Sequence, residues 1–486
     1  MRYEPTRESV RHHPVPEWYH DAKLGIFVHW GLYSVPGWAP LSGEYKKLIA
    51  QEGWANWFSK NPYAEWYLNT IRIEGSPSQR YHLETYGQGF SYDGFAPLFN
   101  AAIGGWDASE WASLFRKAGA RYVVLTTKHH DGFLLWPSEY PNPKKKDYIA
   151  SRDIVGELAE AVRGQGMKMG LYYSGGLDWS FDQRAIRDAV DLLDTMPQGM
   201  DYVQLVSHHW RELIERYEPS VVWNDIGYPA AANVNALFAD YYNRLPEGVV
   251  NDRFMQVDLS RSAVGRILRS RPVRVIVSRL LQWAYARMEA LPVSGHCDFR
   301  TPEYAAFSKI TQYKWEATRG LGYSFGYNRN EGPDNLISLE DLIHSFVDTV
   351  SKNGNLLLNV GPMADGTIPE AQRERLEGLG QWLDVNGEAI FGTRPWLWAE
   401  GSTDGGIPVR FTQKVDAIYA ILLGRPRRQE VSIDLPCVAE ETIVHLLGHD
   451  SPLRWAQNGK RLTVSLPQDL PPSAAYALRI GRSPSD

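Results

Sequence analysis

Apolar positions along the larger part of the chain recur in a fixed order: a helical face, a glycine, and a short apolar strand. In one such unit, Asp107 is a suitable helix cap, and Glu110 takes the third position of the helix. The apolar residues that follow have the spacing of one buried helical face: Trp111, Leu114, Phe115 and Ala118. Gly119 ends this face, and residues 121–127 (RYVVLTT) are predicted to form a strand.

The unit recurs twice, as helix 154–162 with strand 167–174 and as helix 213–217 with strand 220–224. Apolar strands that alternate with helices indicate a parallel sheet covered on both faces. This alternation fits both an open sheet and a barrel. We favour an α/β fold of the (β/α)8-type barrel class because polar residues end several different strands, as on the C-terminal rim of such barrels. No GxGxxG motif supports a dinucleotide-binding fold.

The pattern changes near residue 394, after a last predicted helix at about 370–390. The segments that follow are short, β-patterned and separated by Gly, Pro, Asp and Asn: 415–423, 430–436, 441–448, 461–467 and 474–480. We therefore predict a barrel domain at 1–393 and a C-terminal antiparallel β-sandwich domain at 394–486.

One stretch inside the barrel domain, at about 254–297, has seven Arg and no Lys, with only Asp258 and Glu289 as acidic residues. Such a basic segment is typical either of a partner-binding patch or of a surface insertion. Composition alone does not distinguish these two interpretations.

Composition narrows the class of protein. The net charge of −6 argues against a nucleic-acid-binding protein. No apolar run approaches the roughly 18 residues of a membrane span, and the charged, proline-containing first residues predict no signal peptide, hence a cytoplasmic location. Cys297 and Cys437 are too few for a disulfide framework or a four-cysteine zinc site. The 18 Trp and 26 Tyr either fill a core or offer flat faces on which sugar rings stack.

Polar side chains stand where four predicted strands end: His29, His129–His130, Tyr172 and Asp225. Each alone is explained by ordinary structural roles, but their convergence favours a site. Imidazoles and phenols suit sugar hydroxyls, and a carboxylate can attack an electrophilic carbon. A metal site at His29, His129 and His130 is the alternative, although neighbouring residues on an extended strand point to opposite faces.

Hydrolysis of a glycosidic bond requires two carboxyl groups. Asp225 is a good nucleophile candidate because it ends a strand and follows Trp223, whose ring can exclude water. Its partner is not fixed by these arguments, since several glutamates lie in aromatic or loop settings: Glu44, Glu65, Glu74 and Glu303.

Seven segments resemble the α-L-fucosidase family, glycoside hydrolase family 29, and occur in that family's order: LGIFVHWGLYS, TTKHHDGF, YYSGGLDW, WNDIGYP, DFRTPEY, YSFGYNRNEG and NGNLLLNVGPMADGTIP. The resemblance covers most of residues 15–394 and weakens in the C-terminal domain. It implies that Asp225 is the nucleophile and that Glu303, in TPEY, is the acid/base residue. It also implies that the following residues bind the fucose hydroxyls or shape the pocket: His29, Glu65, His129, His130, Tyr172, Trp223 and Arg253.

Fucose is a 6-deoxy sugar whose methyl group needs an apolar contact, for which Phe27 and Phe325 are candidates, although ordinary barrel packing explains both as well. One departure from the family pattern is the separation of Arg253 and Glu303 by 50 residues, where the family has a much shorter connection. The Arg-rich stretch fills this excess, and loops absorb added length at a modest cost in entropy.

The resemblance implies an exo-acting, retaining α-L-fucosidase that hydrolyses terminal α-L-fucosyl linkages by double displacement, with no cofactor and no metal. Its expected partner is a fucosylated oligosaccharide or glycoconjugate, and self-association stays open. Two alternatives remain: a catalytically impaired fucose-binding protein and a metal-dependent barrel hydrolase.

Overall fold

An eight-stranded parallel sheet organises the first part of the computed structural model, which describes residues 2–258, 265, 267–268, 270–285, 295–436 and 438–481. Its strand order is β5-β4-β3-β2-β1-β8-β7-β6. The two end strands meet through a parallel bridge between Asn251 and Phe299 and a hydrogen bond of 2.9 Å from Asp298 N to Val250 O. The sheet is thus a nearly closed barrel, and this confirms the predicted fold class. Its strands are β1 (Leu24–Val28), β2 (Tyr122–Lys128), β3 (Lys168–Ser174), β4 (Val221–Asp225), β5 (Val249–Val250), β6 (Phe299–Arg300), β7 (Lys314–Gly320) and β8 (Gly354–Val360).

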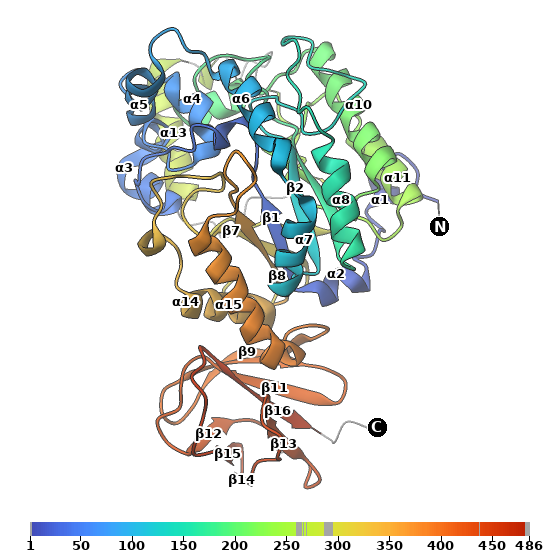
Figure 1. Cartoon of the computed structure of the whole chain (residues 1–486). Coiled ribbons are helices and arrows are strands. Elements are labelled where there is room, and N and C mark those ends of the chain that lie inside the picture. Colours follow the sequence, from blue (N-terminus) through green and yellow to red (C-terminus); the bar gives the residue numbers. More distant parts are fainter. Residues whose placement is uncertain are drawn as a thin grey trace.

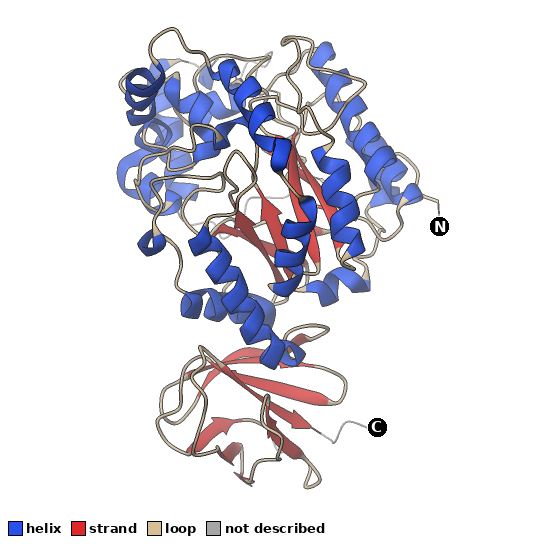
Figure 2. Cartoon of the chain, viewed as in Figure 1, coloured by secondary structure: helices blue, strands red, loops and turns tan. Residues whose placement is uncertain are grey.

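Helices surround this sheet (Figure 2). The helix predicted after Asp107 is α7, and the Asp107 carboxylate caps it by accepting from Ser109 N at 2.8 Å. The other large helices of the ring are α8 (Ile154–Gly164), α10 (Met200–Tyr217), α11 (Val234–Arg244), α14 (Leu339–Ser351) and α15 (Glu370–Asn386), with α7 at Ala108–Lys117. Shorter or peripheral helices are α1 (Arg7–Val10), α2 (Glu17–Ala22), α3 (Tyr45–Ser59), α4 (Tyr67–Ile71), α5 (Pro77–Tyr86), α6 (Phe95–Ala102), α9 (Ala189–Asp194) and α13 (Arg271–Tyr285). No helix of the described residues is long and apolar enough to cross a membrane.

Side chains fill the barrel interior, and one of them is a fully buried acid, Glu316. Its carboxylate accepts hydrogen bonds from the hydroxyls of Tyr19 (2.8 Å) and Tyr122 (2.5 Å) and from Trp223 Nε1 (3.0 Å). Burial nevertheless raises the pKa of Glu316. Trp223 lies on β4 two residues before Asp225, so its hydrogen bond to Glu316 helps to fix the end of this strand.

Two antiparallel sheets form the C-terminal part of the chain, which lies below the barrel in Figure 1. Their orders are β13-β16-β11-β10-β9 and β12-β15-β14, and an apolar core lies between them, as predicted for a β-sandwich. The strand β9 begins at Arg394. The strands are β9 (Arg394–Ser402), β10 (Pro408–Gln413), β11 (Ala417–Leu422), β12 (Glu430–Asp434), β13 (Ile443–Leu446), β14 (Trp455–Asn458), β15 (Arg461–Ser465) and β16 (Tyr476–Gly481).

The Arg-rich stretch contains α13, which packs against α3 and α9. Arg274 forms ion pairs with Asp188 (2.6 Å) and Asp191 (2.7 Å), and Gln282 Nε2 donates to Ile49 O at 2.8 Å. The apolar side chains on the opposite side of α13 are exposed: Val275, Ile276, Leu280 and Trp283. This part of the stretch therefore lies on the surface, attached to the barrel by polar contacts. Glu289 and Cys437 lie outside the described residues, as do four of the seven arginines in the stretch: Arg261, Arg266, Arg269 and Arg287.

Candidate active site

The carboxylate of Asp225 lies at the C-terminal end of β4 and is held at both oxygens. Tyr172 OH donates to Oδ2 at 2.8 Å, and Arg253 Nη1 donates to Oδ1 at 2.9 Å. Gly227 follows at φ +110°, a value that favours glycine, so the chain turns sharply after the strand. Burial alone would raise the pKa of Asp225, but the Arg253 guanidinium and the Tyr172 hydroxyl hold it below its ordinary value. Asp225 is therefore an ionised, oriented carboxylate, as a nucleophile requires.

The carboxylate of Glu303 meets Asp225 through a shared arginine. Arg253 Nη2 donates to Glu303 Oε2 at 3.2 Å, and Tyr63 OH donates to Oε1 at 3.0 Å. Because the two terminal nitrogens of one guanidinium bind the two acids, the carboxylates lie within roughly 8 Å of each other. The long connection between Arg253 and Glu303 therefore does not separate the predicted acid pair.

Arg253 itself is fixed from three sides. Its Nε donates to Thr301 Oγ1 at 2.9 Å, its Nη2 lies 3.3 Å from Thr301 O, and its guanidinium lies 4.8 Å from the Trp223 ring centre. Thr301 stands two residues before Glu303, so the same loop holds both the arginine and the second acid. The predicted pocket residues Trp223 and Arg253 are thus parts of one cluster with the two carboxylates.

The three predicted histidines are buried next to one another. The ring of His129 lies 4.0 Å from that of His130, 5.8 Å from that of His29 and 5.8 Å from that of Tyr172. Neighbouring residues on an extended strand point to opposite faces, but β2 ends at Lys128 and the chain turns there, with Gly132 N donating to His129 O. Among the described residues, no group of three or more His, Cys, Asp or Glu side chains could hold a metal ion.

Burial keeps these imidazoles neutral. It lowers the pKa of His29 to about 4 and that of His130 to about 3, and it lowers the pKa of His129 well below the ordinary value. His29 Nδ1 lies 2.6 Å from Asn359 Oδ1, and His130 Nδ1 lies 2.6 Å from Ser174 Oγ. The site therefore offers neutral, oriented hydrogen-bonding groups beside an ionised aspartate.

The remaining predicted residues border the same cluster. The ring centre of His29 lies 4.4 Å from that of Phe27 and 5.1 Å from that of Phe325. Glu65 Oε2 accepts from Gly326 N at 2.8 Å, and burial raises the pKa of Glu65 to about 8. Of the other glutamates considered, Glu44 pairs with Lys47 and Glu74 is exposed.

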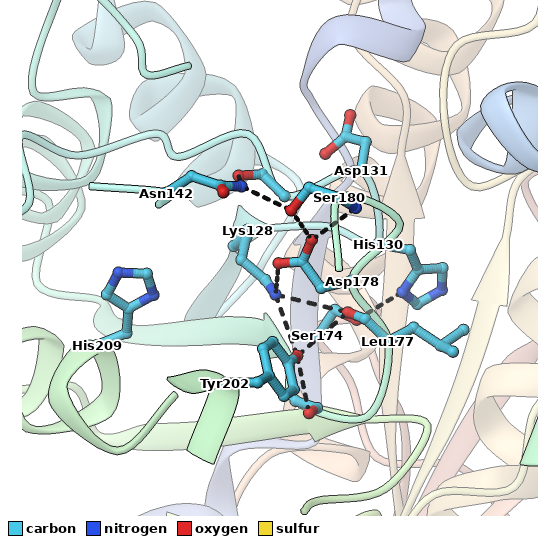
Figure 3. A network of polar contacts seen from close by, with 12 residues as sticks. Lys128, His130, Asp131, Asn142, Ser174, Leu177, Asp178, Ser180, Tyr202 and His209 are labelled. Carbon is cyan, nitrogen blue, oxygen red and sulfur yellow. Dashed lines mark hydrogen bonds and ion pairs between the residues drawn. The ribbon is translucent and has the colours of Figure 1, made fainter. Parts of the chain in front are cut away.

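The sequence did not reveal the residues that contact and orient the predicted site residues. Lys128 Nζ forms a buried ion pair of 2.9 Å with Asp178, and it lies in the loop network that surrounds His130 (Figure 3). Tyr63, Ser174 and Asn359 were also not singled out. Their neighbours in the chain were the only signal: Lys128 precedes His129 in TTKHHDGF, and Asn359 lies near the end of the strand in NLLLNVGP.

A barrel with two carboxylates converging at the C-terminal ends of its strands, beside neutral imidazoles and phenols, defines the class of barrel glycoside hydrolases. Comparison with known proteins agrees with this. The Alpha-L-fucosidase family model matches residues 1–388, and the model of the Alpha-L-fucosidase C-terminal domain matches residues 406–481. The chain belongs to the α-L-fucosidase family.

Individual relatives extend over nearly the whole chain. The human tissue α-L-fucosidase is 33% identical over 496 residues, covering 98% of this chain and 90% of that protein. The α-L-fucosidase of Branchiostoma floridae is 32% identical over 488 residues, covering 99% of this chain and 96% of that protein. A Thermotoga maritima α-fucosidase structure in complex with fucose has a TM-score of 0.81 and 42% identity, covering 99% of this chain and 100% of that chain.

Proposed function

We propose that this chain is an exo-acting α-L-fucosidase that releases terminal L-fucose from fucosylated glycans with net retention by double displacement. Asp225 is the nucleophile and Glu303 is the general acid/base. The observation that carries this proposal is the bridge formed by Arg253, which binds both carboxylates at once. A retaining mechanism needs the two carboxyl groups about 5 to 5.5 Å apart, a separation that this bridge permits.

In the first step, an Asp225 oxygen bonds to the anomeric carbon while the glycosidic C–O bond breaks and protonated Glu303 gives its proton to the leaving oxygen. In the second step, water attacks the same carbon, Glu303 takes the proton, and the bond to Asp225 breaks. Forming the covalent intermediate removes the negative charge of Asp225. Of the two carboxyl groups bound to the Arg253 guanidinium, only that of Glu303 can then be negatively charged, and this favours the ionised form of Glu303, which acts as the base.

The buried groups around Asp225 would bind the sugar. His29, His129, His130 and Glu65 face the hydroxyls, and Phe27 or Phe325 receives the C6 methyl group. The Thermotoga maritima relative that was solved with fucose supports this class of ligand.

Replacement of the nucleophile tests the mechanism. We expect Asp225→Gly to lower kcat on 4-nitrophenyl α-L-fucoside by orders of magnitude, because no covalent intermediate can form. Sodium azide should restore turnover and give β-L-fucosyl azide, since azide fills the space that the carboxylate leaves. Wild-type activity in this variant would exclude Asp225 as the nucleophile, and no release of nitrophenol by the unaltered protein would favour a fucose-binding protein.

Replacement of the acid tests Glu303 separately. We expect Glu303→Ala to retain much of its activity on fucosides with good leaving groups and to lose it by orders of magnitude on those with poor ones, because only poor leaving groups need the proton. Glu74→Ala, an exposed glutamate, is the matched control and should change neither rate. Equal losses on both substrate types would assign the acid role to another residue, with Glu65 the next candidate.

A further inference from the structure

Two of the buried histidines, His29 and His130, each contact at Nδ1 an oxygen that has no hydrogen left to donate. We propose that Asn359 and Ser174 lock these histidines in the Nδ1–H tautomer, so that each presents an unprotonated Nε2 that accepts a hydrogen bond from a sugar hydroxyl. Asn359 and Ser174 are thus positioning residues that set which hydroxyls the site recognises. The inference rests on the proposed function for the identity of the sugar, but the tautomers are measurable without it.

The argument for His29 begins at Asn359. Asn359 Nδ2 donates to Phe325 O at 2.7 Å, so the amide oxygen must be the atom that faces His29 Nδ1 at 2.6 Å. The flipped amide would place two oxygens 2.7 Å apart with no hydrogen between them. An amide oxygen only accepts, and therefore His29 Nδ1 carries the hydrogen.

The argument for His130 uses the single hydrogen of a hydroxyl. Ser174 Oγ lies 2.8 Å from Leu177 O, and a carbonyl oxygen only accepts, so the serine hydrogen is used there. Ser174 Oγ can then only accept from His130 Nδ1, which lies 2.6 Å away. Both histidines therefore have the same tautomer although they come from different strands.

The second ring nitrogen of each histidine is left for the ligand. No hydrogen bond joins His29 Nε2 or His130 Nε2 to another described residue, and neither nitrogen belongs to the fully buried side-chain atoms that lack a partner. Because burial lowers the pKa of both imidazoles far below 7, Nε2 carries a lone pair and no hydrogen at neutral pH. A hydroxyl that meets this nitrogen must donate to it.

Hydrogen bonds and a buried ion pair fix the loop after Ser174, which contains residues 177–180. Lys128 Nζ pairs with Asp178 at 2.9 Å, and Asp178 Oδ1 accepts from Ser180 Oγ and Ser180 N (Figure 3). Trp179 N donates to His130 O at 2.7 Å, so the same loop also fixes the backbone of the histidine. This buried network keeps Leu177 O where it can engage the Ser174 hydroxyl.

Nitrogen NMR of the whole protein labelled with 15N-histidine tests the tautomers directly. His29 and His130 should each show a protonated Nδ1 and an unprotonated Nε2, with assignment by loss of the signals in His29→Asn and His130→Asn. A protonated Nε2 in either residue of the unaltered protein would overturn the proposal for that residue. This measurement does not depend on activity or on the identity of the substrate.

A serine variant tests the lock itself. In Ser174→Ala, His130 should show a mixture of tautomers while His29 is unchanged. Ser351→Ala is the matched control, since Ser351 is equally buried and donates only to Asp348 O in α14. A pure Nδ1–H tautomer of His130 in folded Ser174→Ala would show that Ser174 does not set it.

Binding of fucose analogues tests the consequence for recognition. Fluorine accepts but cannot donate, so at the hydroxyls that face His29 and His130 the deoxyfluoro analogue should bind no better than the deoxy analogue, each roughly 3- to 10-fold weaker than L-fucose. In Ser174→Ala, the fluoro analogue at one position should regain affinity. Fluoro analogues that bind better than deoxy analogues at every position would overturn the inference, whereas failure of L-fucose itself to bind would count against the proposed function and leave the NMR result standing.

Discussion

At the scale of single residues, Arg253 explains how Glu303 can lie beside Asp225 although a long segment separates Arg253 from Glu303 in the sequence. Its guanidinium binds Asp225, Glu303 and the Thr301 hydroxyl with separate nitrogens. A planar group with five donors can hold three acceptors in fixed directions, which a lysine ammonium on a flexible stem cannot do. The loop that carries Glu303 is therefore positioned at its end, whatever the length of the chain before it.

Glu65 should make folding stability depend on pH in a defined direction. Burial raises the pKa of Glu65 to about 8, whereas an unfolded glutamate ionises near pH 4.5. Between these pH values the unfolded chain has lost a proton that the folded chain keeps. The free energy of unfolding is therefore highest below pH 4.5 and falls as the pH rises, by at most about 1.4 kcal/mol per pH unit. In Glu65→Gln this loss is absent, so the melting temperature of the variant should rise relative to the unaltered protein from pH 5 to pH 8.

Thermal denaturation at several pH values measures this difference. Glu74→Gln replaces an exposed glutamate and should leave the pH dependence of the melting temperature unchanged. Parallel curves for Glu65→Gln and the unaltered protein would show that Glu65 is ionised in the folded state.

The catalytic candidates could be found from the sequence because each stands at the end of an apolar strand, where a side chain of that chemistry is conspicuous. Asp225 after Trp223 and His130 after residues 121–127 are examples. The choice of Glu303 over Glu65 came from family resemblance, since no spacing rule relates a residue on a later loop to β4. The roles of Ser174 and Asn359 could not be predicted from the sequence, because they depend on which carbonyl oxygen accepts their hydrogen.

At the scale of elements, the sequence pattern located the strands β2, β3 and β4, although it did not single out β7, which is as long as β2 and β3. The predicted strands 121–127 and 167–174 are β2 and β3 within one residue. The strands β5 and β6 have two residues each, too few to carry any periodicity, so closure of the barrel had to be inferred from the positions of polar residues. The strand β9 was also not singled out, because its buried and exposed positions do not alternate strictly.

The attachment of α13 to the barrel should depend on Arg274. Its ion pairs with Asp188 and Asp191 join α13 to α9, and Asp188 also caps α9 by accepting from Val190 N. Loss of these charged hydrogen bonds in Arg274→Ala should favour local opening of α13, with tryptic cleavage after the exposed Arg279 roughly fivefold faster.

Mass spectrometry of the cleavage products over time measures this rate. Arg461→Ala is the control, because Arg461 pairs with Asp434 only at 3.9 Å and both side chains are exposed. Unchanged cleavage after Arg279 in Arg274→Ala would mean that apolar packing and Gln282 hold α13 in place.

At the scale of the whole molecule, the apolar core of the barrel domain extends onto one face of the C-terminal sheets, which have a second core between them. Alternate residues of β11, Tyr419 and Ile421, belong to the same buried cluster as helix α15, whereas Leu422 points into the core of the sandwich. Trp382 Nε1 in α15 donates to Ala475 O at 3.0 Å, and α14 and α15 lie between the two parts in Figure 1. A sheet buried on both faces in this way cannot unfold without exposing the barrel helices.

We therefore expect the two parts to unfold together. Leu422→Ala opens a cavity in the sandwich, far from Asp225, and should cost about 2 to 5 kcal/mol of folding free energy. If unfolding is cooperative, calorimetry shows a single transition that moves down by several degrees, and residual fucosidase activity after heating is lost at the same lower temperature. Val415→Ala, at a fully exposed position beside β11, should change neither measurement. A second, lower transition that leaves the temperature of activity loss unchanged would show instead that the C-terminal sheets unfold alone, despite the face that they share with α15.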